Sequence, residues 1–258
     1  MNLELEGKRV FVTASTDGIG KAIAESFLEE GAIVTVNGRN QSRLDRVILD
    51  FSKKYDGHRI HGAIGDMSKE EDIRRVKCFI SSEFGKLDIL IGNLGTGKPI
   101  SADKLDITEW HHMYDYNLFS AVHLISAFED ILKKQENASI VLLSSLAGYE
   151  RIGAPIAYAA AKNGIRTLVK YLADEYAAYG IRVNGVAPGN ILFPGGRWEE
   201  LQKRNIEGIR EYIEKEVPMN RFGAPKEIAN LVLFLASNRA SFITGEIVKA
   251  DGGQSRTV

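Results

Sequence analysis

The chain has little cysteine, little excess charge and no long apolar run. Cys78 is the only cysteine among 258 residues, which excludes an intrachain disulfide and fits a reducing compartment. A formal net charge of −1 gives no global basic field to attract nucleic acid or an acidic membrane. No apolar run approaches the roughly 20 residues that span a bilayer, and residues 1–8 lack a signal-like apolar core. We therefore expect a cytoplasmic chain with a small-molecule partner, no nucleic acid and no membrane.

The sequence also lacks the residue groups of a metal site and of an intact P-loop. His111 and His112 are adjacent, so on a helix they point in different directions, and no nearby Cys/His cluster completes a ligand set. Gly92–Lys98 nearly matches a P-loop after a strand, but Pro99 stands where a Ser or Thr hydroxyl should reach Mg²⁺. We predict no metal site and disfavour an NTPase.

What the chain does have is an alternation of short apolar stretches with helical patterns, without a long linker or an internal repeat. This alternation predicts an α/β fold, a Rossmann-type doubly wound parallel sheet of about seven strands with helices on both faces. With 44% hydrophobic residues, the chain can bury the core of one domain over residues 1–258. The predicted strands lie near residues 8–13, 32–37, 58–64, 87–92, 138–144, 181–187 and 246–249.

The first predicted strand leads into a turn with glycines and then a helix. Gly18-Ile19-Gly20 opens that helix, and its glycines would let the backbone approach a pyrophosphate, which the N–H groups at the helix N-terminus attract. Ala14 stands where a further glycine would ease the turn. Taken alone, the turn fits an ordinary tight connection about as well as a nucleotide site.

Tyr158 and Lys162, four residues apart, indicate acid–base chemistry. Residues at this spacing share a helix face, so the Lys162 ammonium is expected to lower the pKa of the Tyr158 phenol. Ser145 follows an apolar strand, and its hydroxyl could hydrogen-bond a carbonyl oxygen near the tyrosine. A tyrosine and a lysine at this spacing also occur by chance on solvated helices.

These motifs, in this order, resemble the short-chain dehydrogenase/reductase family along essentially the whole chain. Asp66 resembles its adenine-contacting acidic residue and Asn117 its catalytic asparagine, and Pro188-Gly189 and Asp251-Gly-Gly253 match downstream. The resemblance implies an NAD(P)(H)-dependent oxidoreductase that interconverts a carbonyl and a secondary alcohol by hydride transfer. The implied catalytic residues are Asn117, Ser145, Tyr158 and Lys162. The implied cofactor-binding residues are Thr13, Ser15, Asp17, Gly18, Ile19, Gly20, Arg39, Asp66, Met67, Asn93, Gly95, Tyr158, Lys162, Pro188, Gly189 and Ile191.

The resemblance also implies a role for each catalytic residue. Tyr158 donates or accepts the proton, and Ser145 orients the substrate oxygen. Lys162 also binds the ribose, and Asn117 holds a proton-relay water. Several site residues follow the ends of different predicted strands, at the edge where such sheets bind ligands. These residues are Thr13, Asp66, Asn93, Ser145 and Pro188.

Three positions depart from the family pattern. Ala14 replaces a glycine of the turn, Gly92 stands where the family usually has asparagine, and Phe193 lies near where a threonine often contacts the nicotinamide amide. A noncatalytic nucleotide-binding regulator on the same fold is therefore kept as an alternative.

The residues after the second predicted strand bear on cofactor choice. An acidic residue there would bind both ribose hydroxyls and repel a 2′-phosphate, but this chain reads Gly38-Arg39-Asn40. Arg39 could pair with the phosphate, so we predict NADP(H) in preference to NAD(H). An arginine on a loop is also very often solvated surface, and Asp17 has the wrong charge for a neighbouring phosphate.

Residues 190–217 interrupt the alternation with Pro194-Gly-Gly196 followed by spaced apolar residues. We expect a substrate lid over the nicotinamide pocket, the alternative being a packed amphipathic helix. The residues expected to line the pocket are Leu94, Leu146, Ile152, Pro188, Ile191 and Trp198.

The branch of the family and the oligomeric state are inferred from the resemblance alone. Residues 158–162 and 242–245 look like the 3-oxoacyl-acyl-carrier-protein reductase branch, and similar stretches occur in sugar (glucose-type) dehydrogenases. In the family, the helices that carry Asn117 and Tyr158 pair with those of a neighbour, so a homotetramer is implied.

Overall fold

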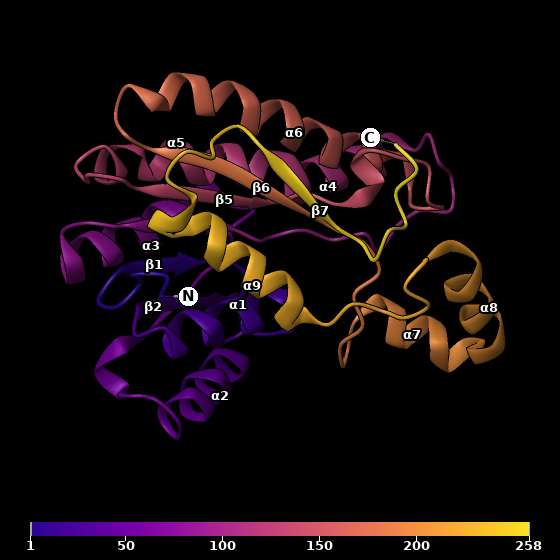
Figure 1. Ribbon diagram of the computed structural model, residues 1–258, viewed down its shortest axis with the longest axis horizontal. Coiled ribbons are helices and arrows are strands. Elements are labelled where there is room, and N and C mark those ends of the chain that lie inside the picture. Colours follow the sequence, from indigo (N-terminus) through magenta and orange to yellow (C-terminus); the bar gives the residue numbers. More distant parts are fainter. Residues whose placement is uncertain (1, 258) are drawn as a thin grey trace.

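Parallel strands form one sheet in the order β3-β2-β1-β4-β5-β6-β7 (Figure 1). The computed structural model describes residues 2–257, and within them each predicted strand range overlaps one observed strand. The strands are β1 (Arg9–Val12), β2 (Ile33–Gly38), β3 (Ile60–Ile64), β4 (Ile89–Gly92), β5 (Ser139–Leu143), β6 (Arg182–Pro188) and β7 (Ile247–Ala250). The strand predicted from residue 58 begins at Ile60, because Gly57–Arg59 forms a 3-10 turn that the Asp56 side chain caps.

Helices cover both faces of the sheet, as the alternation predicts. On one face pack α1 (Gly18–Glu29), α2 (Gln41–Ser52) and α9 (Pro225–Ala236). On the other pack α3 (Glu70–Phe84), α5 (Ser120–Leu132) and α6 (Ile156–Ala177) (Figure 1). The side chains of β1 divide between the two cores, Val10 and Val12 to the first and Phe11 to the second, because successive strand residues point to opposite faces. The doubly wound fold class is confirmed.

Strand order reverses between β1 and β4. β1 pairs with β2 on one side and with β4 on the other. The chain after β1 therefore leads to one side of the sheet, and the chain after β4 leads to the other. Doubly wound sheets bind ligands in the crevice outside the carboxyl ends of the strands at such a point.

Two further helical segments lie near this edge of the sheet. α4 (Ile107–Tyr114) continues through a π-helical turn, Asp115–Phe119, into α5. The region predicted as a lid, 190–217, contains α7 (Arg197–Arg204) and α8 (Ile206–Glu216), which stand together at one end of the molecule (Figure 1). Helical structure here agrees with both readings of the segment, so the lid stays a prediction.

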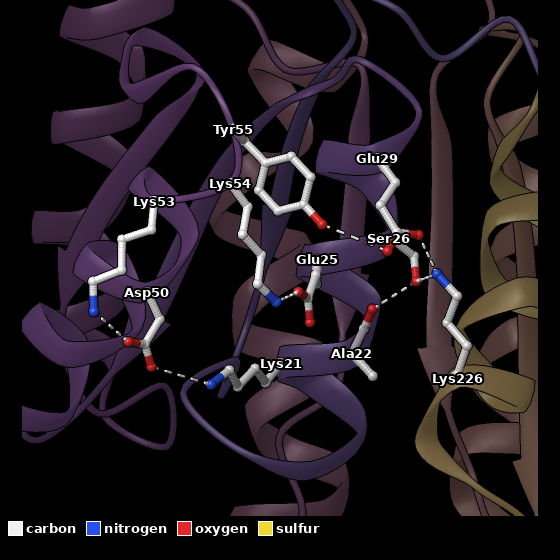
Figure 2. A network of polar contacts seen from close by, with 10 residues as sticks. All are labelled: Lys21, Ala22, Glu25, Ser26, Glu29, Asp50, Lys53, Lys54, Tyr55 and Lys226. Carbon is white, nitrogen blue, oxygen red and sulfur yellow. Dashed lines mark hydrogen bonds and ion pairs between the residues drawn. The ribbon is translucent and has the colours of Figure 1, made fainter.

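A polar network joins α9 to α1 and α2 on the outside of the first helical layer (Figure 2). The Lys226 ammonium lies 3.0 Å from Ser26 Oγ and also pairs with Glu29. Lys54 pairs with Glu25 at 2.7 Å. Because these ion pairs are largely exposed, each contributes little to stability, and the apolar packing beneath them holds the layer.

Within residues 2–257, no helix has the length and apolar character needed to cross a membrane. The same residues contain no group of three or more His, Cys, Asp or Glu side chains placed to hold a metal ion. Cys78 is exposed on α3.

Candidate active site

A cleft of about 340 Å³ opens at the carboxyl ends of β1, β4, β5 and β6. It gathers most of the residues that the sequence singles out, from segments far apart in the chain. The predicted site residues that line it are Asp17, Gly18, Ile19, Gly20, Asn93, Gly95, Ser145, Tyr158, Lys162, Pro188, Gly189 and Ile191. The remaining predicted site residues, Thr13, Ser15, Arg39, Asp66, Met67 and Asn117, lie outside its lining.

Buried hydrogen bonds fix the turn between β1 and α1. The Asn37 side chain accepts from Ala14 N at 2.9 Å and donates to the carbonyls of Ala63 and Gly65. Asn93 Nδ2 donates to the carbonyls of Thr13 and Ala14, both at 3.1 Å. The turn is thus anchored to the ends of β2, β3 and β4. Asn37 is a contributor that the sequence analysis missed, because only its position opposite the turn reveals it.

Ala14 adopts a left-handed backbone conformation, with φ of +48°. Such a conformation costs an L-residue roughly 1–2 kcal/mol relative to a right-handed one. The departure from glycine at this position is therefore accommodated with strain, and the hydrogen bonds from Asn37 and Asn93 hold it in place.

Thr13 and Ser15 are both fully buried, and they support the turn from behind. Thr13 Oγ1 donates to Ile91 O and accepts from Asn93 N at 2.9 Å. Ser15 Oγ donates to Val12 O and accepts from Asn37 N. Their hydroxyls are used within the protein, so any contact with a cofactor would come from their backbone.

The first helical turn of α1 forms part of the wall of the cleft. Asp17 caps this helix, accepting from Gly18 N at 2.7 Å. The N–H groups of a first helical turn lack intrahelical acceptors and lie at the positive end of the helix dipole. A Cβ at Gly20 would stand 2.4 Å from Ala14 O, so only glycine permits this close packing.

Tyr158 and Lys162 meet as the helical spacing predicts, but the expected effect on the tyrosine pKa is wrong. Burial raises the pKa of Tyr158 above its ordinary value of 10.0, and a hydrogen bond with Ser145 opposes this only in part. The Lys162 ammonium lies 6.0 Å from the centre of the tyrosine ring and donates to Leu143 O at 2.8 Å. Burial lowers the pKa of Lys162 from 10.5 to about 8. Desolvation therefore dominates the pKa values of both groups.

Asn117 lies behind the cleft and holds its rim. It is buried in the π-helical turn, where its Oδ1 accepts from Thr96 N and its Nδ2 donates to Thr96 O, both at 3.0 Å. The neighbouring Gly95 packs so closely that a Cβ there would stand 2.8 Å from Asn117 Oδ1 and 2.9 Å from Lys162 Nζ. The asparagine thereby links the loop after β4 to the π-helical turn between α4 and α5. π-Helical turns are frequent at functional sites.

Arg39 and Asp66 meet at the ends of β2 and β3, beside the main cleft. The Arg39 guanidinium lies 3.8 Å from Asp66 Oδ2, and Tyr116 Oη lies within hydrogen-bonding distance of both side chains. Burial alone would raise the pKa of Asp66, but hydrogen bonds from Ser68 and the charge of Arg39 lower it overall. Met67, by contrast, is buried in the second core and presents its side chain to α3 rather than to a ligand.

The other two departures from the family pattern have steric reasons. A Cβ at Gly92 would come within 2.5 Å of Leu142 Cδ2 on the adjacent strand, so an asparagine does not fit without displacing that leucine. The Phe193 ring lies over the start of α1, where a Cβ at Gly18 would meet its Cε2 at 2.6 Å. An aromatic ring thus packs where the family often has a hydroxyl.

An aromatic cluster packs around Trp198, which lines the cleft. Trp198 on α7 stacks on Tyr212 of α8, with ring centroids 5.4 Å apart, and also contacts Phe222. Trp198 and Ile191 line the cleft as expected, whereas Leu146 is fully buried and Leu94 packs against the second core. Those two pocket assignments are wrong, because apolar character alone does not separate a pocket wall from the core, and Ile152 lies outside the lining as well. Arg197, Thr96 and Gly97 line the cleft and were not singled out from the sequence.

The cleft fits a dinucleotide. The glycines and N–H groups at the first turn of α1 suit a pyrophosphate, and Lys162 and Tyr158 line the same cleft. The Asp17 carboxylate accepts from Gly18 N, which leaves the other N–H groups of the first turn to hold a phosphate.

Replacing the buried lysine should reveal its pKa in the stability of the protein. The unfolded lysine titrates near 10.5 and the folded one near 8, so the unfolded chain binds more protons between these values and native stability rises with pH. For Lys162→Met this contribution is absent. The free energy of unfolding of the wild type should rise relative to that of the variant by on the order of 2 kcal/mol between pH 7 and pH 10. Urea unfolding of both proteins across this range measures it, and a constant difference would contradict the lowered pKa.

Comparison with known proteins agrees with this geometry. A family model described as enoyl-(acyl carrier protein) reductase matches residues 13–255. The 3-oxoacyl-acyl-carrier-protein reductase of Aquifex aeolicus is 32% identical over 98% of this chain and 99% of its own length. A tropinone reductase homolog of Arabidopsis thaliana is 35% identical over 96% of this chain and 91% of its own.

Solved structures give the same result. L-Sorbose reductase from Gluconobacter frateurii, complexed with NADPH and L-sorbose, superposes with a TM-score of 0.92 and 30% identity, covering 100% of both chains. A 7α-hydroxysteroid dehydrogenase complexed with NADH and 7-oxo glycochenodeoxycholic acid gives 0.89 and 31%, covering 99% of this chain and 97% of its own. Since the family match and these relatives span nearly its whole length, the chain belongs to the short-chain dehydrogenase/reductase family of oxidoreductases.

Proposed function

We propose that the protein is an NADP(H)-dependent oxidoreductase that interconverts a carbonyl and a secondary alcohol. The observation that carries the proposal is the meeting of Tyr158 and Ser145 on one wall of the cleft, with Lys162 buried one helical turn behind the tyrosine. Bound in this cleft, the nicotinamide would supply or accept the hydride. The residues of the chain then have to manage the proton and the substrate oxygen.

The side chains divide this work according to their chemistry. The Tyr158 hydroxyl donates a proton to the carbonyl oxygen during reduction and takes it back during oxidation. Ser145 donates a hydrogen bond to the same oxygen and holds it near the phenol. Because burial raises the pKa of Tyr158, the protein without ligands favours the protonated phenol, the form that reduction requires.

Lys162 and Asn117 act around the tyrosine. The lysine is anchored by Leu143 O, and its lowered pKa of about 8 lets it hold or release a proton near neutral pH. The Asn117 side chain keeps the Thr96 loop in place, and Gly97 of that loop packs against the Tyr158 ring. We infer that this support sets the orientation of the phenol.

The proposed preference for NADP(H) depends on Arg39. Its side chain is 67% exposed and follows β2 directly. The sequence at this point has no carboxylate that would bind both ribose hydroxyls. The L-sorbose reductase structure contains NADPH, whereas the hydroxysteroid dehydrogenase contains NADH, so fold alone does not choose between the cofactors.

Two substrate classes have support. The 3-oxoacyl-acyl-carrier-protein reductases among the relatives favour a 3-oxoacyl thioester. The likeness to L-sorbose reductase favours a sugar or polyol, for which an aromatic wall such as Trp198 offers a stacking surface. Turnover with a 3-oxoacyl thioester and with a ketose, compared by kcat/KM, separates the two.

We expect Tyr158→Phe to lose turnover and keep its cofactor. Loss of the acid–base group should lower kcat by about 10²–10⁴-fold, since the ring and its packing remain. Steady-state rates and NADPH fluorescence titration measure the two effects. Tyr171→Phe, an exposed tyrosine on the same helix, serves as the control. Unchanged turnover of Tyr158→Phe would overturn the acid–base role of Tyr158, whereas a wild type that binds the cofactor without any turnover would favour the noncatalytic regulator.

Arg39→Ala should weaken NADPH binding selectively. Loss of a charge-assisted contact to the 2′-phosphate should raise the NADPH dissociation constant roughly tenfold and leave NADH binding unchanged. Arg74→Ala, another exposed arginine, is the matched control. Wild-type protein that binds NADH as tightly as NADPH would refute the preference.

Two predictions about larger motions and assembly accompany this function. We propose that residues 190–217 close over the cleft, so saturating cofactor should slow proteolysis within α7 and α8, and unchanged cleavage would refute the lid. We also propose that the protein is cytoplasmic and forms a homotetramer, and the exposed apolar side chains of Val122 on α5 and Ile156 on α6 support the assembly. Light scattering gives the number of 28.5 kDa chains in the assembly.

A further inference from the structure

Arg39 is held by a tyrosine from a distant part of the chain. Its Nη1 donates to Tyr116 Oη at 3.2 Å, across 77 positions of sequence. Tyr116 Oη donates in turn to Asp66 Oδ2 at 3.4 Å. The phenol oxygen, the Arg39 nitrogen and the Asp66 oxygen therefore form a triangle, in which the arginine and the carboxylate are themselves 3.8 Å apart.

The position of Tyr116 is set by the π-helical turn between α4 and α5. Its ring is half-buried and packs on His112, one turn earlier, with ring centroids 4.8 Å apart. The next residue, Asn117, is buried against the Thr96 loop. The turn thus places neighbouring side chains at two ends of the site, one at Arg39 and one behind the catalytic tyrosine.

Without the phenol, Asp66 would compete for the arginine. The Asp66 side chain is only 14% exposed and stays ionised, because Ser68 donates to it from both backbone and side chain. A carboxylate this close attracts a guanidinium into a direct bidentate pair, which would use the N–H groups that a phosphate needs. Tyr116 takes one N–H of Arg39 and satisfies one oxygen of Asp66, and the remaining guanidinium donors stay available.

We propose that Tyr116 is a specificity-determining residue that orients Arg39 toward the 2′-phosphate of the cofactor. This inference rests on the proposed use of NADP(H). The hydroxyl group carries the effect, since it is hydrogen-bonded to both charged side chains.

The test is Tyr116→Phe, which removes the hydroxyl and keeps the ring on His112. Calorimetric titration with adenosine 2′,5′-bisphosphate reports the phosphate site without any chemistry, and fluorescence titration compares NADPH with NADH. We expect the dissociation constants of the bisphosphate and of NADPH to rise roughly threefold to tenfold, while that of NADH is unchanged. Tyr114→Phe, in the same helical segment and packed on Trp110, is the control. In an Arg39→Ala background, Tyr116→Phe should have no further effect on NADPH binding.

The outcomes separate this inference from the function beneath it. If wild-type protein shows no preference for NADPH over NADH, the cofactor assignment fails, and the role of Tyr116 fails with it. If the wild type prefers NADPH and Tyr116→Phe keeps the full preference, only the role of Tyr116 is overturned. Equal weakening of NADPH and NADH would also overturn it, because the tyrosine would then support the adenosine site in general. Thermal unfolding of each variant confirms that the compared proteins are folded.

Discussion

The site depends on buried hydrogen bonds that tie the carboxyl ends of neighbouring strands together. Asn37 and Asn93 each bond backbone groups of the turn after β1, and Thr13 joins that turn to β4. Inside a core, every such polar group must find a partner, so a shift of one strand end would leave several unsatisfied. The turn is thereby fixed in a conformation that Ala14 would not adopt unaided. The start of α1 and the floor of the cleft follow from it.

A second constraint is the absence of space around Lys162. The lysine is 3% exposed, and Gly95 leaves no room for a side chain beside its ammonium. Close packing excludes the water that would otherwise stabilise the charge, and this desolvation sets the pKa values of both Lys162 and Tyr158. The tertiary packing around the reactive groups therefore sets their pKa values more than their four-residue spacing does.

Much of the fold and part of the site were accessible from the sequence. Strand alternation and the four-residue spacing of Tyr158 and Lys162 are local patterns, and local patterns predict elements and shared faces well. The direction of the Tyr158 pKa was mispredicted, because burial depends on tertiary packing. The roles of Asn37 and Tyr116 were invisible for a related reason, since their partners lie more than 20 positions away along the chain.

The π-helical turn at Asp115–Phe119 has a geometrical effect on the helices that it joins. A regular α-helix turns about 100° per residue, so the additional residue of a π turn rotates everything after it by about that amount. Asn117 can therefore face the Thr96 loop, while α5 presents Leu124 and Phe128 to the second core. One helical segment thus packs against two surfaces that the single hydrophobic stripe of a regular helix could not both face. The rotation occurs at the residues that face the site.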